Sequence, residues 1–297
     1  MDLLLTDLET KLRERWDDDE RWAVYADALL ASGDARGELI SLELRLARGE
    51  DPALRAAIEA LRSEHERREE SEALLKYGWE LGWERGFITR LRTIDLGEAS
   101  EIEGLASLLA DPALRMLRRL ELRVSKTAPA PVFAAVTTLE LGPLRALQIA
   151  DASIDDQLAD ARWRLPETLV ELDLRYAGLS DRSLAAVLER APPLRRLSLQ
   201  HNALSPAGAD HIAHCEALTQ LQFLDLRGNP LTAAGARRLA QATKLRALET
   251  LLIDRYKIGV RGMEALGESR ALAPTITRFC RARAKQRRSS LHGEDDP

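Results

Sequence analysis

The chain has 297 residues, of which 45% are hydrophobic and only 4% aromatic, so it can bury a large core built mainly from leucine and alanine. Its 43 basic and 48 acidic residues nearly balance at a formal charge of -5, which argues against a protein that coats nucleic acid or anionic lipid along its whole length. The two cysteines lie far apart and in no CxxC spacing, so neither a disulfide framework nor a thiolate zinc site is expected.

The first residues, MDLLLTDLETKLRER, carry acids where a signal peptide is basic. No segment approaches the roughly 18 uninterrupted apolar residues that a membrane-spanning helix needs. We therefore expect a cytoplasmic protein with reduced thiols and no membrane contact.

Residues 1–78 are predicted to form an all-α segment that lies before the rest of the fold. The apolar spacing predicts helices near 2–15, 19–32 and 36–47, and a fourth that begins at Asp51 and Pro52. The buried stripe of the second helix is expected to contain Trp22, Tyr25, Ala26, Leu29 and Leu30.

The turn after the second helix concentrates charged residues. Gly33 ends that helix, and Asp34 is expected to cap the third helix. Arg36 is expected to pair with Asp27 or Glu38 and hold the turn. A binding site on this turn is the alternative interpretation.

A phrase with the pattern LxxLxL organises most of the remaining chain. Its leucines alternate as in a short strand with one buried face, and the dozen residues that follow have helical spacing. One such unit cannot bury its own leucines, so the units must stack on one another. The seven copies are LRTIDLGEASEI at 91, LRRLELRVSKT at 117, LRALQIADASI at 144, LVELDLRYAGL at 169, LRRLSLQHNAL at 194, LQFLDLRGNPL at 221 and LETLLIDRYKI at 248.

These copies resemble the leucine-rich repeat family, in its long ribonuclease-inhibitor-like form, over roughly residues 87–270. The resemblance implies an α/β fold, a curved solenoid with parallel strands inside and helices outside. The family's asparagine position is filled by Asn202 and Asn229, and is replaced by Ser125, Ala152, Ala177 and Tyr256 in other copies.

The stretches WAVYADALLASGDARGELI at 22 and GWERGFITRL at 82 resemble the bacterial repeat-companion domain, a short helical module found beside such repeats. The resemblance carries no activity. We expect a helical capping domain at 1–78, a solenoid of about seven repeats at 79–270 and a basic C-terminal tail at 271–297. Trp79, Trp83 and Phe87 are expected at the junction of cap and solenoid.

Catalytic and metal-binding signatures are weak. His211, His214 and Cys215 could share one helix face, but no fourth ligand is implied and their helix lies on the outside of a repeat. No serine, cysteine or kinase signature occurs, and the glycines at 259–267 follow no phosphate-loop pattern. We expect no catalytic activity, no cofactor and no bound metal.

Side chains alternate along a strand, so the variable positions inside LxxLxL should point into the concave face of the solenoid. In the first copy these positions are Thr93, Asp95 and Gly97. The face mixes acids and arginines around one aromatic ring, which suits a protein partner; the alternative is that the charges only pair across strands and keep the face solvated. The candidate partner-binding residues are Arg119, Glu121, Arg123, Glu171, Asp173, Arg175, Arg196, Gln200, Phe223, Asp225, Arg227 and Asp254.

The C-terminal segment is a second candidate surface, because no acid occurs between Arg270 and Arg288. It is either a solvated tail or a contact for nucleic acid or an acidic protein, and such a contact would weaken with salt. Its basic residues are Arg278, Arg281, Arg283, Lys285, Arg287 and Arg288.

Three functions follow from these surfaces. The first is a scaffold that binds a protein on its concave face, for which reversing the charge of Arg175 and Arg227 should abolish binding and leave the melting temperature nearly unchanged. The second is nucleic-acid or acidic-partner binding through the tail. The third, regulation of a GTPase, rests on fold analogy alone.

Overall fold

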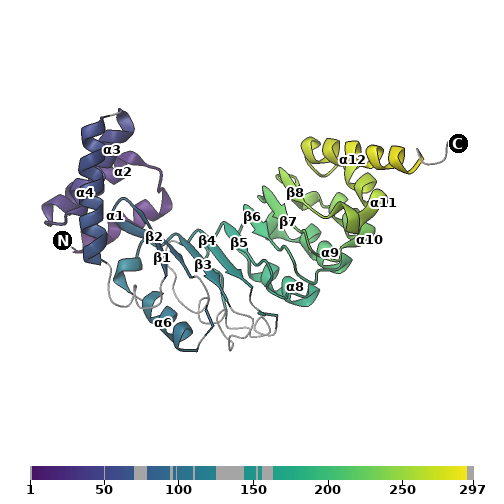
Figure 1. Cartoon of the computed structure of the whole chain (residues 1–297), viewed down its shortest axis with the longest axis horizontal. Coiled ribbons are helices and arrows are strands. Elements are labelled where there is room, and N and C mark those ends of the chain that lie inside the picture. Colours follow the sequence, from purple (N-terminus) through teal and green to yellow (C-terminus); the bar gives the residue numbers. More distant parts are fainter. Residues whose placement is uncertain are drawn as a thin grey trace.

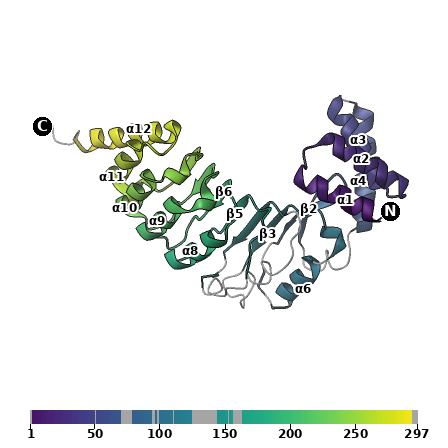
Figure 2. The ribbon, with the colours of Figure 1, turned by 180° about the vertical axis from the view of Figure 1, so that it is seen from behind.

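The computed structural model describes residues 2–49, 51–69, 79–93, 96–97, 99–109, 111–124, 144–151, 153–155 and 163–292. Strands and helices form one curved array, with the strands on the inner side of the arc and the helices on the outer side (Figure 1). A helical bundle stands at the N-terminal end, and a long helix leaves the other end (Figure 2). The chain therefore has two end structures and a repeated centre.

The N-terminal bundle contains the four helices that the sequence predicts. They are α1 (Asp2–Glu14), α2 (Asp19–Ala31), α3 (Arg36–Arg48) and α4 (Pro52–Glu69). The side chain of Asp18 caps α2 by accepting from the Arg21 N–H, and Gly33 takes the left-handed conformation that the following turn needs. Gly37 lets α3 cross α2 closely, because a Cβ there would lie 2.5 Å from the Ala26 oxygen.

Two expectations about this bundle are wrong. Trp22, Tyr25, Ala26 and Leu29 are buried, but Leu30 is 48% exposed because it has turned out of the stripe they form. Arg36 pairs with Asp34, and not with Asp27 or Glu38, because Asp34 Oδ1 also accepts from the Arg36 backbone N–H and folds the side chain back. Burial alone raises the pKa of Asp34, but the hydrogen bonds from Arg36 outweigh it and lower that pKa.

An eight-stranded sheet follows the chain in strict order from β1 to β8. β1 and β2 form an antiparallel hairpin, and every later strand is parallel to the one before it. The middle leucines, such as Leu172 and Leu197, lie in register and are buried. The residues before and after each of these leucines therefore point to the concave side of the sheet. The strands are β1 (Glu80–Glu84), β2 (Phe87–Arg92), β3 (Arg119–Arg123), β4 (Ala146–Ala150), β5 (Glu171–Asp173), β6 (Arg196–Ser198), β7 (Phe223–Asp225) and β8 (Thr250–Leu252).

Helices on the outer side complete the units. Ser205 caps α9 and Pro206 is its first residue, and Ser180 forms a capping box with Ser183 at the start of α8. The outer elements are α6 (Ala99–Leu109), η1 (Pro112–Leu114), α8 (Asp181–Arg190), α9 (Pro206–His214), η3 (Glu216–Leu218), α10 (Thr232–Ala240), η4 (Thr243–Leu245) and α11 (Arg255–Gly267).

The first repeat begins three residues earlier than its sequence pattern indicates. Leu91 pairs with Leu120 and Arg90 with Arg119, so Arg90 and Arg92 occupy the concave positions. Thr93 is only 1% exposed, and its N–H donates to the Glu121 oxygen, so its assignment to the concave face is wrong. Asp95 lies outside the described residues. The shift arises because β2 is also a hairpin strand, whose length the repeat does not set.

Two buried asparagines join consecutive units. Asn229 Nδ2 donates to the oxygens of Leu199 and Leu226, and its Oδ1 accepts from the Leu204 N–H. Asn202 makes the equivalent bonds one unit earlier, to Leu174 and Leu199 as donor and to Leu179 as acceptor. These amides satisfy backbone groups that the turns would otherwise leave unpaired in the core. Of the replacements at this position, Ser125 and Ala152 lie outside the described residues.

The C-terminal segment forms helix α12 (Pro274–His292), whose first half packs on α11. Ile276, Cys280 and Ala284 follow one another at four-residue spacing, and all three are buried in the core of the repeats. This part of the tail is therefore one face of the folded protein and not a solvated extension.

Cys280 is expected to react slowly with iodoacetamide in the folded protein. Burial raises the pKa of its thiol to about 11, so at pH 8 roughly one thiol in a thousand is ionised. Labelling followed by mass spectrometry checks this, with Ile276→Ala expected to accelerate labelling and Phe279→Ala, at an exposed position, to leave it unchanged. Labelling of native protein at the rate of denatured protein would contradict the docking of α12.

Candidate functional site

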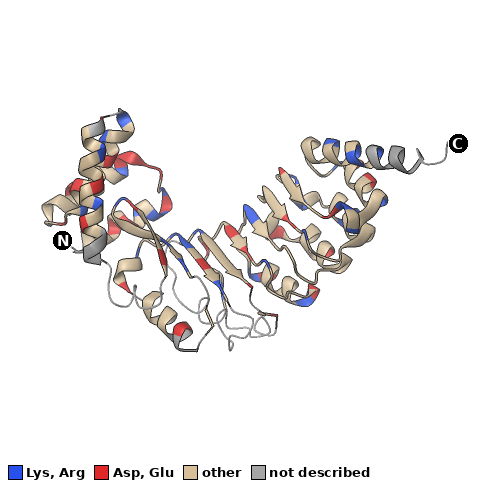
Figure 3. Cartoon of the chain, in the orientation of Figure 1, with Lys and Arg blue, Asp and Glu red and all other residues tan. Residues whose placement is uncertain are grey.

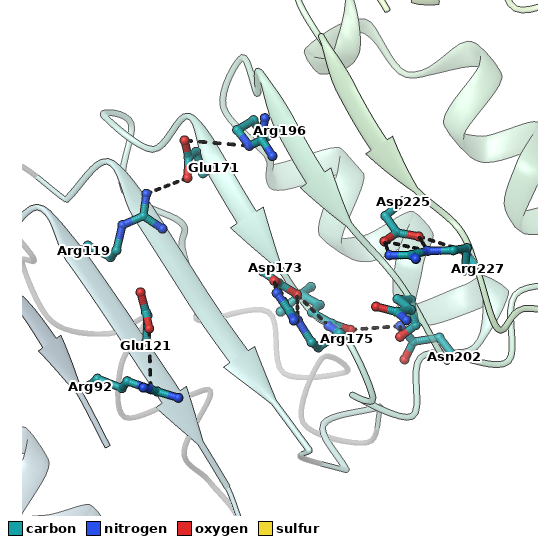
Figure 4. Close-up of polar contacts among 12 residues, drawn as sticks. Arg92, Arg119, Glu121, Glu171, Asp173, Arg175, Arg196, Asn202, Asp225 and Arg227 are labelled. Carbon is teal, nitrogen blue, oxygen red and sulfur yellow. Dashed lines mark hydrogen bonds and ion pairs between the residues drawn. The ribbon is translucent and has the colours of Figure 1, made fainter. Parts of the chain in front are cut away.

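The concave face is built from the two side chains that each short strand directs away from the buried leucines. Arg119, from β3, reaches across β4 to Glu171 of β5, with 2.8 Å between Nη2 and Oε2. This contact spans a whole strand because Ala146, the β4 residue between them in the register, carries only a methyl group. Arg196 approaches Glu171 from the other side at 3.9 Å, so one carboxylate serves two arginines (Figure 4).

Two arginines that the sequence pattern missed extend this face to the first parallel strand. Arg90 donates to Glu121 at 2.9 Å, and Arg92 lies 3.0 Å from Glu80 and 3.8 Å from Glu121. The signal was present in the stretch ITRLRT, where Ile88 and Leu91 have the spacing of the repeat. The register of β2 on β3 places Arg90 beside Arg119 and Arg92 beside Glu121 on the concave face.

Two equivalent aspartate–arginine pairs, which we call clamps, each join the end of a strand to its following turn. They are Asp173 with Arg175 and Asp225 with Arg227. In each, the aspartate accepts from the backbone N–H of the arginine, at 3.1 and 3.0 Å, and binds its guanidinium through both oxygens (Figure 4). These side-chain hydrogen bonds raise the pKa of both arginines. Asp34 and Arg36 repeat the arrangement in the N-terminal bundle.

Arg227→Glu is expected to lower the free energy of unfolding by about 2 kcal/mol, because the side chain of Asp225 is only 4% exposed and would lose its cation. This replaces the sequence-based expectation that such a reversal leaves the melting temperature unchanged. Thermal denaturation followed by circular dichroism measures it. Arg196→Glu is the control, because its nearest carboxylate is 3.9 Å away; equal melting temperatures for the two variants would contradict the clamp.

The centre of the concave face is a hollow of about 290 Å³ between β3 and β7. Phe223 lies on its floor beneath Arg196, whose Cζ is 4.2 Å from the ring centroid. Nine of the predicted residues line the hollow: Arg119, Glu171, Asp173, Arg175, Arg196, Gln200, Phe223, Asp225 and Arg227.

Three other predicted residues lie away from the hollow. Glu121 holds Arg90, and Arg123 pairs with Asp151 at 3.0 Å. Asp254 accepts from the backbone N–H of Gly228 at 2.7 Å, so it supports a turn. These contacts are part of the strand framework, and we do not place them in the candidate site.

An aromatic pair at the edge of the concave face was not predicted. Tyr176 and His201 stack with ring centroids 4.4 Å apart and planes 7° from parallel. Both take left-handed backbone conformations, as do Asp151 and Gly228 at equivalent positions of neighbouring units. The His201 ring lies over Gly228, where a Cβ would come within 2.6 Å of it. The repeated turn position could have indicated this row, but not the stacking.

The basic residues of the tail are divided by the packing of α12. Arg281 Nη2 donates to the Gly267 oxygen at 2.8 Å and so helps to dock the helix. Arg278, Arg283 and Lys285 are exposed on α12, where the described part of the helix carries basic side chains and no acid (Figure 3). The side chains of Arg287 and Arg288 lie outside the described residues.

Comparison with known proteins agrees with this repeated architecture. The family described as FBD-associated F-box protein At5g56370, LRR repeats, matches residues 105–257, which is more than half of the chain. The chain belongs to the leucine-rich repeat family. This confirms the family that the sequence pattern indicated, and the match includes β3 to β8 of the sheet.

No curated protein matches this leucine-rich repeat chain. Across the part of the chain that the structure describes, no helix is long and apolar enough to cross a membrane. The same residues contain no cluster of three or more His, Cys, Asp or Glu side chains that could hold a metal ion, and His211 and His214 lie exposed on α9 of the leucine-rich repeats.

Proposed function

We propose that this protein is a non-catalytic interaction module that binds a protein partner on the concave face of its repeats. Leucine-rich repeat domains generally mediate protein–protein interaction, and the curvature of a solenoid creates an extended surface for it. The partner is a folded protein or loop that enters the hollow over Phe223.

The proposal is supported by the difference in exposure between the arginines and the carboxylates of the hollow. The four arginine side chains that line it are 43–50% exposed, whereas the carboxylates of Glu171, Asp173 and Asp225 that hold them are 33%, 18% and 4% exposed. The acids are thus less exposed than the guanidiniums that they hold, and the guanidiniums keep close to half of their surface in contact with solvent. Fixed arginines lose little side-chain entropy on binding, so the face favours acidic side chains of a partner.

Arg196→Glu is expected to abolish binding without unfolding the protein, because Arg196 is half exposed and covers Phe223. The measurement is a pull-down from native lysate, treated with nuclease and read by mass spectrometry. Arg237→Glu, on the outer face of α10, is the matched control. A partner retained by the control and lost by Arg196→Glu supports the proposal; equal recovery with both variants rules out the concave face.

Nucleic-acid binding through α12 is the second candidate, supported by the exposed Arg278, Arg283 and Lys285. Deleting the segment is a poor test, because Ile276 and Cys280 belong to the core. Omitting nuclease in the same pull-down separates the two functions. Nucleic acid that is recovered by wild type and Arg196→Glu alike, and lost by Arg278→Gln with Lys285→Gln, would favour this second candidate.

A further inference from the structure

The C-terminal end of the sheet contains a groove that the concave-face proposal does not use. It has a volume of about 380 Å³ and lies between β8 and the first half of α12, with Met263 of α11 also in its lining. This volume is within the range of about 300–1,000 Å³ that is common for ligand pockets. The groove therefore has room for several side chains of a bound segment.

One wall of the groove is the open edge of the sheet. β8 is the last strand in the sheet order, and among the described residues its only strand neighbour is β7. The Thr250 N–H donates to Gln222, and the Leu252 oxygen accepts from Leu226, so the backbone groups of Leu251, between them, point away from β7. A row of backbone donors and acceptors at such an edge can pair with another extended segment.

The walls of the groove are mainly apolar. Leu251, Leu252 and Ile253 are only half-buried, whereas the leucines of inner strands are fully buried. Phe279 lines the groove from α12 and is 58% exposed. Ile276 lies beside it in the same lining and is buried. An edge strand beside a helix, with apolar side chains between them, is an arrangement in which peptides bind as an added strand.

The charged residues of the lining favour an acidic occupant. The lining contains two basic residues, Arg255 and Arg283, and one acidic residue, Glu249. The Arg255 Nη2 donates to the Tyr256 hydroxyl, and its Cζ lies 4.6 Å from the centroid of that ring, so within the described part of the chain these contacts are with an aromatic side chain and not with a carboxylate. Figure 3 shows α12, which carries Arg283, with blue and no red along its described length.

We propose that this groove binds an extended segment of a partner protein as a ninth strand of the sheet, with apolar residues alternating with aspartate or glutamate. The apolar side chains pack against Met263, Ile276 and Phe279, the backbone pairs with Leu251, and the acidic side chains meet Arg255 and Arg283. The occupant is a peptide segment of another protein, and this surface is separate from the hollow over Phe223.

The test is a selection of random seven-residue peptides displayed on phage, with the full-length protein as bait. The bait carries Arg196→Glu, so that capture on the concave face is removed. We expect the enriched peptides to alternate apolar and acidic residues. Affinity of the most enriched peptide, measured by fluorescence anisotropy, should fall about tenfold or more in Phe279→Ala and in Arg283→Glu.

Arg278→Glu is the matched control, because Arg278 is exposed on the same helix but does not line the groove. It should change the affinity less than about twofold. N-methylation of alternate peptide amides should also weaken binding about tenfold if the backbone pairs with β8.

Three outcomes would overturn the proposal. One is enrichment of no peptide, or of peptides without acidic residues. The second is an equal effect of Arg278→Glu and Arg283→Glu. The third is a self-association of the protein, seen by sedimentation velocity and abolished by Phe279→Ala, since the occupant would then be a second copy of this chain. None of these outcomes bears on the proposed concave-face function. That function is tested separately, with Arg196→Glu in a protein whose groove is unchanged.

Discussion

Asn229→Ala is expected to lower the free energy of unfolding by about 3 kcal/mol or more, one of the two largest losses we predict. The substitution removes the donors to Leu199 and Leu226 and the acceptor of Leu204, in a side chain that is 1% exposed. Each buried backbone group left without a partner costs about 1–3 kcal/mol. Urea denaturation followed by circular dichroism measures the loss.

Two further variants test the physical cause. Asn229→Asp keeps the acceptor but loses both donors, so it should also destabilise the protein strongly. Gln241→Ala removes an exposed amide from the end of α10 and should change stability by less than about 0.5 kcal/mol. A loss below about 1 kcal/mol for Asn229→Ala would show that the asparagine bonds do not join the units.

Trp22→Ala is the second variant with a large expected effect, about 3–5 kcal/mol in the N-terminal bundle. Trp22 is fully buried, its Nε1 donates to the Trp16 oxygen at 2.6 Å, and its ring lies 4.8 Å from that of Trp16. It also contacts Phe87 of β2, with centroids 6.2 Å apart. Because Phe87 belongs to β2 and pairs with Glu84 in the antiparallel hairpin, the loss should spread from the bundle into the first strands of the sheet.

Hydrogen exchange with mass spectrometry measures that spread. We expect faster exchange in α2 and in the hairpin of β1 and β2, and unchanged exchange in β6 and β7. Val24→Ala, at a 55% exposed position of the same helix, is the control and should alter neither region. Uniformly faster exchange along the whole sheet would mean that the bundle and the repeats unfold as one unit.

Much of the fold could be predicted because its determinants are local or periodic. The four helices of the bundle follow from apolar spacing and from boundary residues such as Gly33 and Pro52. From β3 onward, the LxxLxL pattern predicted the strands, their order and the side chains on the concave face. The same reasoning failed at β2, where Thr93 proved buried, because pairing with β1 sets the start of that strand.

The candidate site was predicted in its composition but not in its arrangement. The contact of Arg119 with Glu171 depends on a small residue in a third strand, which no single repeat reveals. At the predicted junction, Phe87 packs with Trp22 and Tyr25 of the bundle. Trp83 packs against the core of the repeats with its ring 6.0 Å from that of His65 in α4, and Trp79 belongs to the core of the repeats. In the tail, the prediction was based on the many arginines and did not consider the four-residue apolar spacing, by which Ile276 and Cys280 are buried.

The equivalence of Asn202 and Asn229 has a consequence for how such a chain can change in length. Since both amides bind the same backbone groups of the unit before them, residues 202–228 form an interchangeable block whose two boundaries match. A tandem copy of this block would offer the new asparagine its usual partners and would widen the concave face by one strand spacing, about 4.8 Å. Gene duplication can therefore lengthen the concave face in whole strand steps, with no new kind of turn or helix contact required.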